Sequence, residues 1–490
     1  MDLTSLCNFL AVSNLECNFY IDKIYTQKHL FIESLNIKNL LIFLSFFILF
    51  FFLLYFLRLF KNINKYILIF VSFNFAFFLS CITIYPSNIP FTDTWLEIYH
   101  LINNDQLIYL FMGSGDHSFS GFRLFHLIIY KYFSLNYSFL HFINFIIYFI
   151  SFLFLFSYLN KFKNIHLIWI CLFIFFSGKW MNVILEPVNL VWTINFILSI
   201  FFVLSLNLKE GYLKYLIIFL ILLLSALNFG AGIVLLSYSL IYGFFIFINK
   251  KYSYKLFYIT TPVLIYFFVY KFLNVHWQQN TSNTSLSILL DKNLFIIAKD
   301  YFGLSSFIFF PYFSFSKYIS PFIGFLQNMI ILTYISLFNK DFYKTIKNII
   351  LSNPFLFIGI IGCLLVVIVR GSAFEQTRYS SFSIFFQIGF FIFLYQSYPK
   401  IFLFFKKKIF LYFVLISYFI SIIGPNTGIH FAVSRAAIFN QINSCYKSNK
   451  QDCNEVIYHS TLYNSDWLDY DHYLQVMKHL KIYHLSFLKE

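Results

Sequence analysis

Charged residues are scarce in this chain of 490 amino acids. Only 11% of its residues are Asp, Glu, Lys or Arg, whereas 60% are hydrophobic and 74 are Phe. A soluble domain cannot bury that share of apolar side chains, because surface-to-volume scaling limits the fraction of the chain that folding buries. The shortage of charge therefore excludes a soluble globular protein and predicts an integral membrane protein.

Several motifs of soluble proteins are also missing. The sequence has no phosphate-binding glycine loop, no serine nucleophile elbow, no heptad seam and no His or Cys cluster of the kind that holds structural zinc. It also has no aromatic-interleaved basic tract, so the net charge of +15 does not indicate nucleic acid as a partner. Residues 1–37 are mixed and partly polar, so we expect no cleavable signal peptide.

Long apolar runs take the place of these motifs. Most are long enough to cross a hydrocarbon core of ~30 Å as a helix. We predict spans near residues 39–57, 66–85, 137–158, 165–178, 191–208, 214–229, 231–248, 256–273, 320–338, 354–370, 380–397 and 409–424. The fold class is therefore all-α, a polytopic transmembrane helical bundle of about 12 helices embedded in a lipid bilayer.

Lysines gather in alternate linkers, as the positive-inside rule predicts for cytoplasmic segments. These linkers are residues 58–65, 160–164, 207–214, 249–255, 339–347 and 399–408. With them inside, both termini lie outside, together with segments 85–136, 179–190, 274–319 and 371–379. The predicted regions are a polar N-terminal segment (1–38), a transmembrane domain (39–424) with an outer loop (86–136), and a small extracytoplasmic tail (425–490).

The predicted outer boundary has three further features. Trp95, Trp180, Trp192 and Trp277 fall there, where an aromatic belt is expected. Residues 123–133 are too short to cross and predict a helix in a short outer-loop layer. Residues 294–313 are apolar enough to span, but a crossing there would place the Lys-rich 339–347 linker outside. We therefore interpret 294–313 as an interfacial or re-entrant helix.

The tail contains six Lys or Arg residues and six acids, a net charge of zero that suits an exported segment. Cys445 and Cys453 lie eight positions apart within it. In an oxidising compartment they are a disulfide candidate, and two free thiols are the alternative.

Three groups of charge lie on the predicted outer face. They are Asp93, Glu97, Asp116, His117 and Arg123 in the first loop, Lys179 and Glu186 in the second, and Arg370, Glu375, Arg378 and Tyr379 in the third. Acids on one loop and arginines on another are the two halves that an outward site needs for a lipid-phosphate substrate. One half is a general base, and the other is a cationic clamp.

Each of these residues also has a plainer interpretation. Arg370 and Arg378 can hold phosphate oxygens through two guanidinium forks, or they can extend to lipid headgroups as boundary arginines commonly do. His117 alone is equally a surface histidine. Asp93 follows Pro and Ser residues that form a turn, so it is either a loop acid or a base. The sequence does not establish a cofactor. It leaves open that Asp93 or Asp116, together with a phosphate, holds a divalent cation.

Six short segments follow one another in a recognisable order: "FTDTW", "GDHSFSGFRLF", "NLVWTINF", "NFGAG", "VRGSAFEQTRY" and a tail with "SC" and "DC". In this order the chain resembles the GT-C superfamily of polytopic membrane glycosyltransferases, which use polyprenyl-phosphate-linked sugars. It looks most like a poorly characterised bacterial branch of that superfamily. The resemblance covers nearly the whole chain, and each segment is short.

The resemblance implies a multi-pass protein of the bacterial inner (plasma) membrane with an outward active site. Asp93 matches the catalytic base, and Arg370, Arg378 and Tyr379 match an Arg-to-Arg-Tyr pattern that binds the donor phosphate. Asp116 and His117 stand where relatives have Glu-His-Arg. The third residue here is Ser118, so Arg123 would supply that charge. The chain also departs from the pattern by having two predicted spans, instead of one, before the first loop.

The expected reaction is an inverting transfer of a sugar from a polyprenyl-phosphate donor to an envelope glycan, lipid or protein acceptor. A carboxylate takes the acceptor proton, and positive charge stabilises the departing phosphate. The alternatives are an envelope polysaccharide polymerase or ligase, which would typically place its arginines in one large outer loop, and a transporter or flippase. A transporter predicts buried charges in mid-helix and an internal repeat, and the sequence has neither. A purely structural membrane protein is the remaining alternative.

Overall fold

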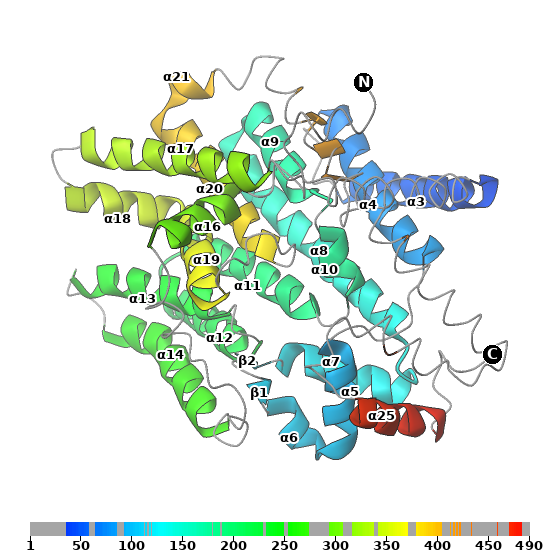
Figure 1. Ribbon diagram of the computed structural model, residues 1–490. Coiled ribbons are helices and arrows are strands. Elements are labelled where there is room, and N and C mark those ends of the chain that lie inside the picture. Colours follow the sequence, from blue (N-terminus) through cyan, green and yellow to red (C-terminus); the bar gives the residue numbers. More distant parts are fainter. Residues whose placement is uncertain are drawn as a thin grey trace.

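The computed structural model describes most of the helical body of the chain. The described residues are 36–57, 64–85, 93–111, 113–114, 117–118, 120–178, 180–186, 189–228, 232–248, 253–273, 294–306, 316–337, 342–370, 379–403 and 470–482, with scattered positions between 412 and 458. These residues are helical apart from turns and a two-residue antiparallel ladder, in which β1 (Gly113–Ser114) pairs with β2 (His117–Ser118). The predicted all-α class is confirmed (Figure 1).

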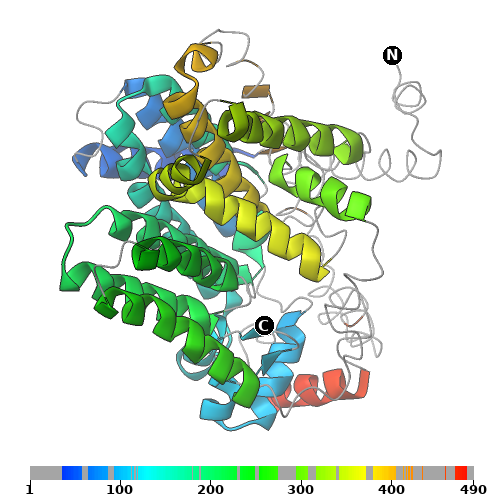
Figure 2. The same ribbon diagram turned by 90° about the vertical axis from the view of Figure 1, so that its left-hand side faces the viewer.

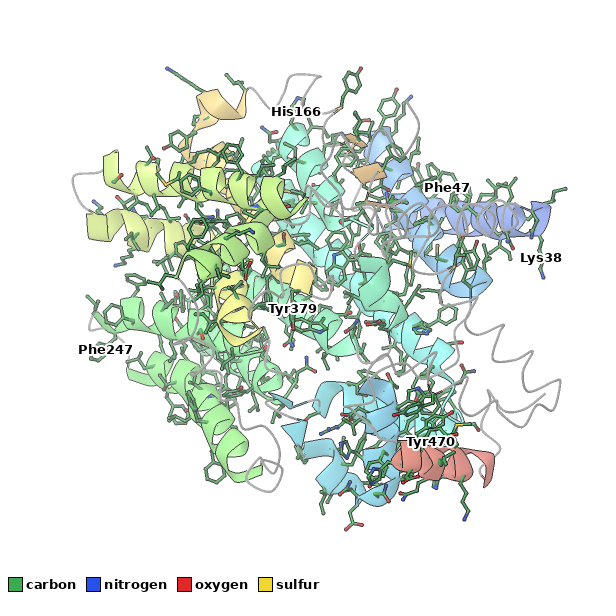
Figure 3. All side chains as sticks on the ribbon, in the orientation of Figure 1. Lys38, Phe47, His166, Phe247, Tyr379 and Tyr470 are labelled. Atoms are coloured by element: carbon green, nitrogen blue, oxygen red, sulfur yellow. The ribbon has the colours of Figure 1, made fainter. Side chains whose placement is uncertain are left out.

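Four described helices are long and apolar enough to cross a membrane. They are α3 (Ile37–Phe56), α4 (Lys65–Ile84), α8 (Tyr137–Leu159, extended by the 3₁₀ turn Asn160–Phe162) and α17 (Ser316–Leu337). Exposed apolar side chains such as Phe247, which is 64% exposed, lie at the periphery, as expected for a surface that contacts lipid (Figure 3). The prediction of a membrane protein is therefore supported.

Asparagine caps the first turn of four apolar helices, namely α3, α4, α8 and α9 (Ile165–Phe175). The side-chain oxygens of Asn36, Asn64, Asn136 and Asn164 each accept a hydrogen bond from a backbone N–H two or three residues later. An Asn side chain in this position satisfies a donor that the first helical turn leaves without an intrahelical partner. The local sequence thus fixes where α3, α4, α8 and α9 begin.

Most other predicted spans coincide with apolar helices whose fully described parts are 17 residues or shorter, such as Lys255–Phe268 of α14 (Ser253–Leu273), and so do not count as crossings. They are α9 (Ile165–Phe175), α11 (Leu190–Leu206), α12 (Tyr212–Asn228), α13 (Gly232–Ile248), α14 (Ser253–Leu273) and α20 (Ser380–Ser397), which is followed by the short α21 (Pro399–Phe402). Helices α8, α9, α11 and α20 surround the aromatic core, where the rings of Phe196 and Phe385 stack 4.5 Å apart.

A sharp bend joins α18 (Phe342–Ser352) to α19 (Pro354–Arg370), and the two axes differ by 95°. The break falls at Asn353, directly before Pro354, because the proline ring disfavours helical geometry in the residue that precedes it. The buried Asn353 amide donates to the carbonyl oxygen of Gly389 at 2.7 Å, which fixes the bend against α20. The Lys-rich segment 339–347, predicted as a plain linker, therefore contains the first half of an amphipathic helix.

Helix α16 (Leu294–Ser306) occupies the segment predicted to be interfacial or re-entrant, and its 13 residues are too few to span. Its last residues, Ser305 and Ser306, are fully buried against α17 and α20. The amides of Gln327 and Gln387 bond to each other at 2.7 and 2.8 Å, and Gln387 also donates to the carbonyl oxygen of Ser305 at 2.7 Å. This buried network satisfies the carbonyl end of a helix that stops inside the protein.

Three helices from the first predicted outer loop form a group at one end of the molecule. They are α5 (Asp93–Asn103), α6 (Gln106–Phe111) and α7 (Ser120–Tyr132). Helix α25 (Tyr470–Ile482), from the tail, lies against α5 in both views (Figures 1 and 2). We call α5, α6, α7 and α25 the terminal layer.

The predicted aromatic belt is wrong for three of its four tryptophans. Trp95 and Trp180 have no exposed surface, and Trp192 is 5% exposed. A belt side chain contacts lipid headgroups, whereas these rings pack on Tyr473, Phe196 and Phe382. Trp95 therefore packs within the terminal layer, and Trp180 and Trp192 pack within the bundle. Trp277 lies outside the described residues.

Candidate functional site

The predicted site residues are only partly within the described structure. Asp93 is the first residue of α5, His117 lies in β2, and Arg370 is the last residue of α19, each described through its backbone. Tyr379 is described fully, buried at the start of α20. Four others lie outside the described residues: Asp116, Arg378, Cys445 and Cys453.

Arg123 lies in a buried ion pair. Its Nε donates to Glu97 Oε2 at 2.7 Å, and its Nη2 donates to Glu97 Oε1 at 2.9 Å. The two side chains are 0% and 2% exposed. Taking both charges out of water costs several kcal/mol for each ion, so only this two-bonded geometry keeps them there. The structure thus gives the guanidinium a protein partner, Glu97, where the sequence predicted a substrate.

Two tyrosines and a histidine continue this buried cluster. The Tyr109 hydroxyl lies 2.6 Å from His126 Nδ1, and His126 Nε2 lies 2.9 Å from the Tyr137 hydroxyl. The Arg123 guanidinium carbon lies 5.2 Å from the centre of the Tyr109 ring, a cation–π contact. One imidazole therefore links α6, α7 and the first residue of α8, which attaches the terminal layer to a membrane-spanning helix.

Burial sets the protonation states of this cluster. Burial lowers the pKa of His126 to about 4, because the charged imidazolium loses its hydration, and the nearby Glu97 carboxylate offsets this effect only in part. His100 is lowered to a pKa of about 4 for the same reason. Burial alone would raise the pKa of Glu97, but the charge and hydrogen bonds of Arg123 bring it below its ordinary value. The cluster at neutral pH is a charged pair beside two neutral histidines.

Gly121 brings α7 against the bundle. A Cβ atom at this position would collide with the side-chain oxygen of Asn228 in α12, so any larger residue would have to displace that side chain or α7. The Asn228 amide in turn donates to the carbonyl oxygen of Val191 in α11 at 3.0 Å. The three segments that contain "SGFRLF", "NLVW" and "NFGAG" therefore meet at one place.

The next residue of α11 extends this junction to the fourth segment. The Trp192 ring meets the Tyr379 ring edge-on at 5.3 Å, and Tyr379 directly follows Arg378 in the sequence. Figure 3 places Tyr379 near the middle of the bundle. Contacts thus run from α5 through α7, α12 and α11 to the start of α20, across segments that are up to about 280 positions apart in the printed sequence.

The described residues offer little for a metal ion. Within them, no three His, Cys, Asp or Glu side chains lie close enough to hold one. The side chains predicted for a divalent cation, those of Asp93 and Asp116, are not among those described. The chemistry available at the described junction is therefore charge and hydrogen bonding from Glu97, Arg123 and the two histidines.

Sequence reasoning assigned no role to His100, Tyr109, His126 or Tyr137. A signal for two of them is present in the sequence. Glu97 and His100 are three positions apart, as are Arg123 and His126, so on two short helices each pair lies on one face. Opposite charges at matching places on two amphipathic helices predict that those faces meet. The tyrosines carry no comparable signal.

Comparison of the chain with models of known protein families, with curated proteins and with solved structures gives no match.

Proposed function

We propose that this protein is an integral membrane glycosyltransferase of the GT-C type, which transfers a sugar from a polyprenyl-phosphate donor with inversion. The acceptor is an envelope glycan, lipid or protein, and Asp93 is the base that takes its proton. In this proposal the chain crosses the bacterial inner membrane about twelve times, and the terminal layer lies on the outer face.

One observation carries the proposal. The segments that contain Asp93, Arg123, Asn228, Trp192 and Tyr379 are joined by direct contacts, although they lie in five separate parts of the sequence. Loops that only connect spans are not required to contact one another. A site for a lipid-linked substrate, in contrast, is built from several loops on one face of the bundle. The packing of α25 on α5 supports a common side for the tail and the first loop.

The contacts also divide the proposed roles. Arg123 is committed to Glu97, so we propose that it positions α5 against α7 while Arg370 and Arg378 supply the charge for the donor phosphate. Glu97 follows Asp93 by four residues on α5, one helical turn away. The ion pair therefore determines where the proposed base stands relative to the rest of the layer.

Asp93 also has a structural interpretation, because an acid at the first position of a helix interacts favourably with the helix dipole and can cap it. The substitution D93N largely separates the two roles, since asparagine caps a helix as well as aspartate does and loses only the modest interaction with the helix dipole, but it cannot act as a base. The matched control is D105N, because Asp105 is an exposed acid between α5 and α6.

The experiment compares the envelope glycans of a strain that lacks the protein with those of strains that express each variant. Mass spectrometry should show a missing sugar in the deletion strain and in D93N, and normal glycans in the wild type and D105N. Normal glycans in a D93N strain that expresses the protein at the wild-type level would reject the base. Accumulated lipid-linked precursor with no defect in sugar transfer by isolated membranes would favour the flippase or the polymerase.

A further inference from the structure

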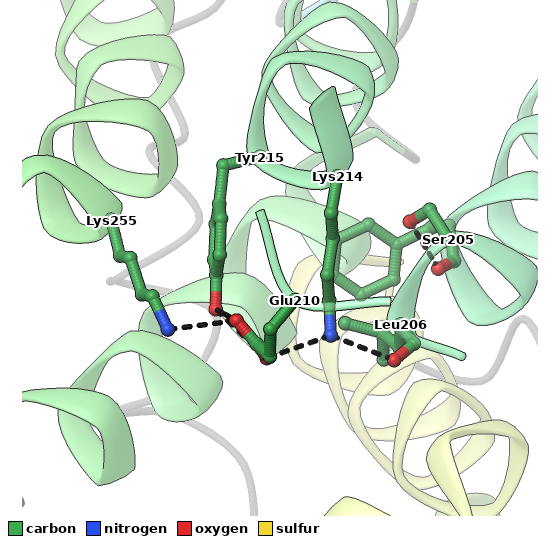
Figure 4. Close-up of polar contacts among 7 residues, drawn as sticks. Ser205, Leu206, Glu210, Lys214, Tyr215 and Lys255 are labelled. Carbon is green, nitrogen blue, oxygen red and sulfur yellow. Dashed lines mark hydrogen bonds and ion pairs between the residues drawn. The ribbon is translucent and has the colours of Figure 1, made fainter. Parts of the chain in front are cut away.

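A second charged cluster lies at the other end of α11 and α12. The linker between these helices carries Glu210, whose Oε1 is 3.1 Å from Lys214 Nζ and whose Oε2 is 2.8 Å from Lys255 Nζ. The Tyr215 hydroxyl donates to Oε2 at 3.1 Å, and Lys214 also donates to the carbonyl oxygen of Leu206 at 2.9 Å (Figure 4). The carboxylate thus joins the beginnings of α12 and α14, and Lys214 joins this pair to the end of α11.

The burial of this cluster is uneven. The side chains of Lys214 and Lys255 are 5% and 7% exposed, whereas that of Glu210 is 59% exposed. The Tyr215 ring centre lies 4.9 Å from Lys255 Nζ and 5.9 Å from Lys214 Nζ, so both ammonium groups are fixed beside it. The cations therefore belong to the packed protein, and the anion between them is open to exchange with solvent.

The local charge balance is strongly positive. Residues 207–255 contain five lysines and a single acid, Glu210. A buried ammonium group keeps its charge only where an anion compensates it. Burial would raise the pKa of Glu210, but hydrogen bonds from Lys255 and Lys214 lower it to about 2, so the carboxylate is charged at neutral pH. Two buried ammonium groups then share one exposed carboxylate.

The cluster and the terminal layer lie at opposite ends of α12. Lys214 is in its first turn, and Asn228, which meets Gly121 of α7, is its last residue. Seventeen helical residues separate the two ends by about 24 Å, close to the thickness of a hydrocarbon core. The Lys-rich linkers predict that this end of α12 faces the cytoplasm. Anionic lipids on that side of a membrane attract basic side chains, and their headgroups bind in basic pockets between helices.

We propose that Lys214 and Lys255 form a binding site for the phosphate group of an anionic membrane lipid, with Glu210 occupying that site in its absence. A phosphate offers at least two oxygens, and lysine binds it as a point charge, so it can meet both ammonium groups as the carboxylate does. The lipid tail lies along the exposed apolar surface of α14, which includes Phe257 and Leu264. This proposal is independent of the glycosyltransferase assignment.

The test measures the unfolding temperature of the purified protein in neutral detergent as lipid is added. Phosphatidylglycerol should raise that temperature for the wild type, and phosphatidylcholine should not, because a bound ligand stabilises the folded state. The matched control is K209M, a lysine in the same linker that is exposed. K209M should respond as the wild type does, and K214M/K255M should lose the response.

The substitution E210Q gives the opposite expectation. Removing the competing carboxylate should lower the half-saturating concentration of phosphatidylglycerol about fivefold, a modest gain because half-exposed ion pairs are weak. E210Q also keeps the proposal testable if K214M/K255M fails to fold. Equal half-saturation in E210Q and the wild type would overturn the site, as would an undiminished response in a folded K214M/K255M. Inorganic phosphate that reproduces the full effect would overturn the assignment to a lipid.

Discussion

The carboxylate of Glu97 and the guanidinium of Arg123 form two parallel hydrogen bonds inside the terminal layer, with almost no exposure of either side chain. Glu97 lies on the helix that begins at Asp93, and Arg123 lies on the helix that meets α11 and α12 through Gly121. The pair is therefore the link between the proposed base and the bundle, and its removal should have consequences for both stability and activity.

Breaking this pair should destabilise the protein strongly. R123M leaves the Glu97 carboxylate buried without its cation, which typically costs about 3–5 kcal/mol. The double substitution E97L/R123M removes both charges and should cost clearly less than R123M alone. The measurement is the unfolding midpoint in detergent, with K131M as the control because Lys131 is an exposed lysine on the same helix. An R123M midpoint equal to that of K131M would contradict the structural role.

The helix positions follow from the sequence because they depend on local properties. Apolar runs predict α3, α4, α8 and α17 within a few residues, and the caps at Asn36 and Asn64 were available as additional local signals. The break before Pro354 is also a local effect. It was missed because the lysines of 339–347 were interpreted only through charge, although their spacing with apolar residues fits an amphipathic helix.

The contacts of the candidate site depend on pairs that are distant in sequence. Nothing near Trp95 shows that it will pack on Tyr473, some 380 positions later, and a boundary tryptophan is more commonly a lipid anchor. Arg123 was predicted to bind substrate because the resemblance implies an arginine where this chain has Ser118, and Arg123 is the nearby residue that could supply that charge. The matching charges of α5 and α7 were a signal that these two helices meet, but they could not show that the Glu97 carboxylate would be buried 2.7 Å from the Arg123 guanidinium.

The two buried histidines should make stability depend on pH. In the folded protein the pKa values of His100 and His126 are about 4, against an ordinary value of 6.5 for an exposed histidine. Between these values the unfolded chain binds more protons than the folded one, so the free energy of unfolding falls as pH falls from about 6.5 to 4. The loss is up to about 3 kcal/mol for each histidine, and full stability is present above pH ~6.5.

Unfolding midpoints measured at intervals from pH 7.5 to 4.5 test this dependence. H126F should be less stable than the wild type at neutral pH, because Tyr109 and Tyr137 lose a buried partner, and its stability should vary less with pH. The control is H472F, which makes the same change in α25. A pH dependence in H126F as steep as that of the wild type would show that His126 does not carry the effect.

The close contact between α7 and α12 can be tested by adding a side chain at Gly121 and then shortening the Asn228 side chain that it would strike. G121A adds a methyl group where the Asn228 side chain lies, so it should push α7 away from the bundle and lower both the unfolding midpoint and sugar transfer. Shortening the obstructing side chain in G121A/N228A should restore part of that loss, although the hydrogen bond to Val191 is gone. Two losses that simply add would contradict the contact, because distant sites behave additively.

The attachment of the tail helix to the terminal layer rests on aromatic side chains. Trp95 and Tyr473 are both fully buried with their ring centres 5.1 Å apart, and the Tyr130 hydroxyl bonds to His479 Nε2 at 3.2 Å. Y473A removes the central contact, and truncating a buried aromatic side chain costs about 3–5 kcal/mol. Because α25 is a short helix that packs on α5, this loss should detach it locally before the bundle unfolds.

Limited proteolysis with a tag at the C-terminus measures this detachment directly. The tag should be released from Y473A at least about tenfold faster than from the wild type, since cleavage follows the population of the opened state. K478A, which changes an exposed residue of the same helix, should be cleaved at the wild-type rate. If Y473A also loses sugar transfer while K478A keeps it, the tail helix holds α5 in its working position. Equal cleavage of Y473A and K478A would mean that the Trp95–Tyr473 contact does not attach α25 to the terminal layer.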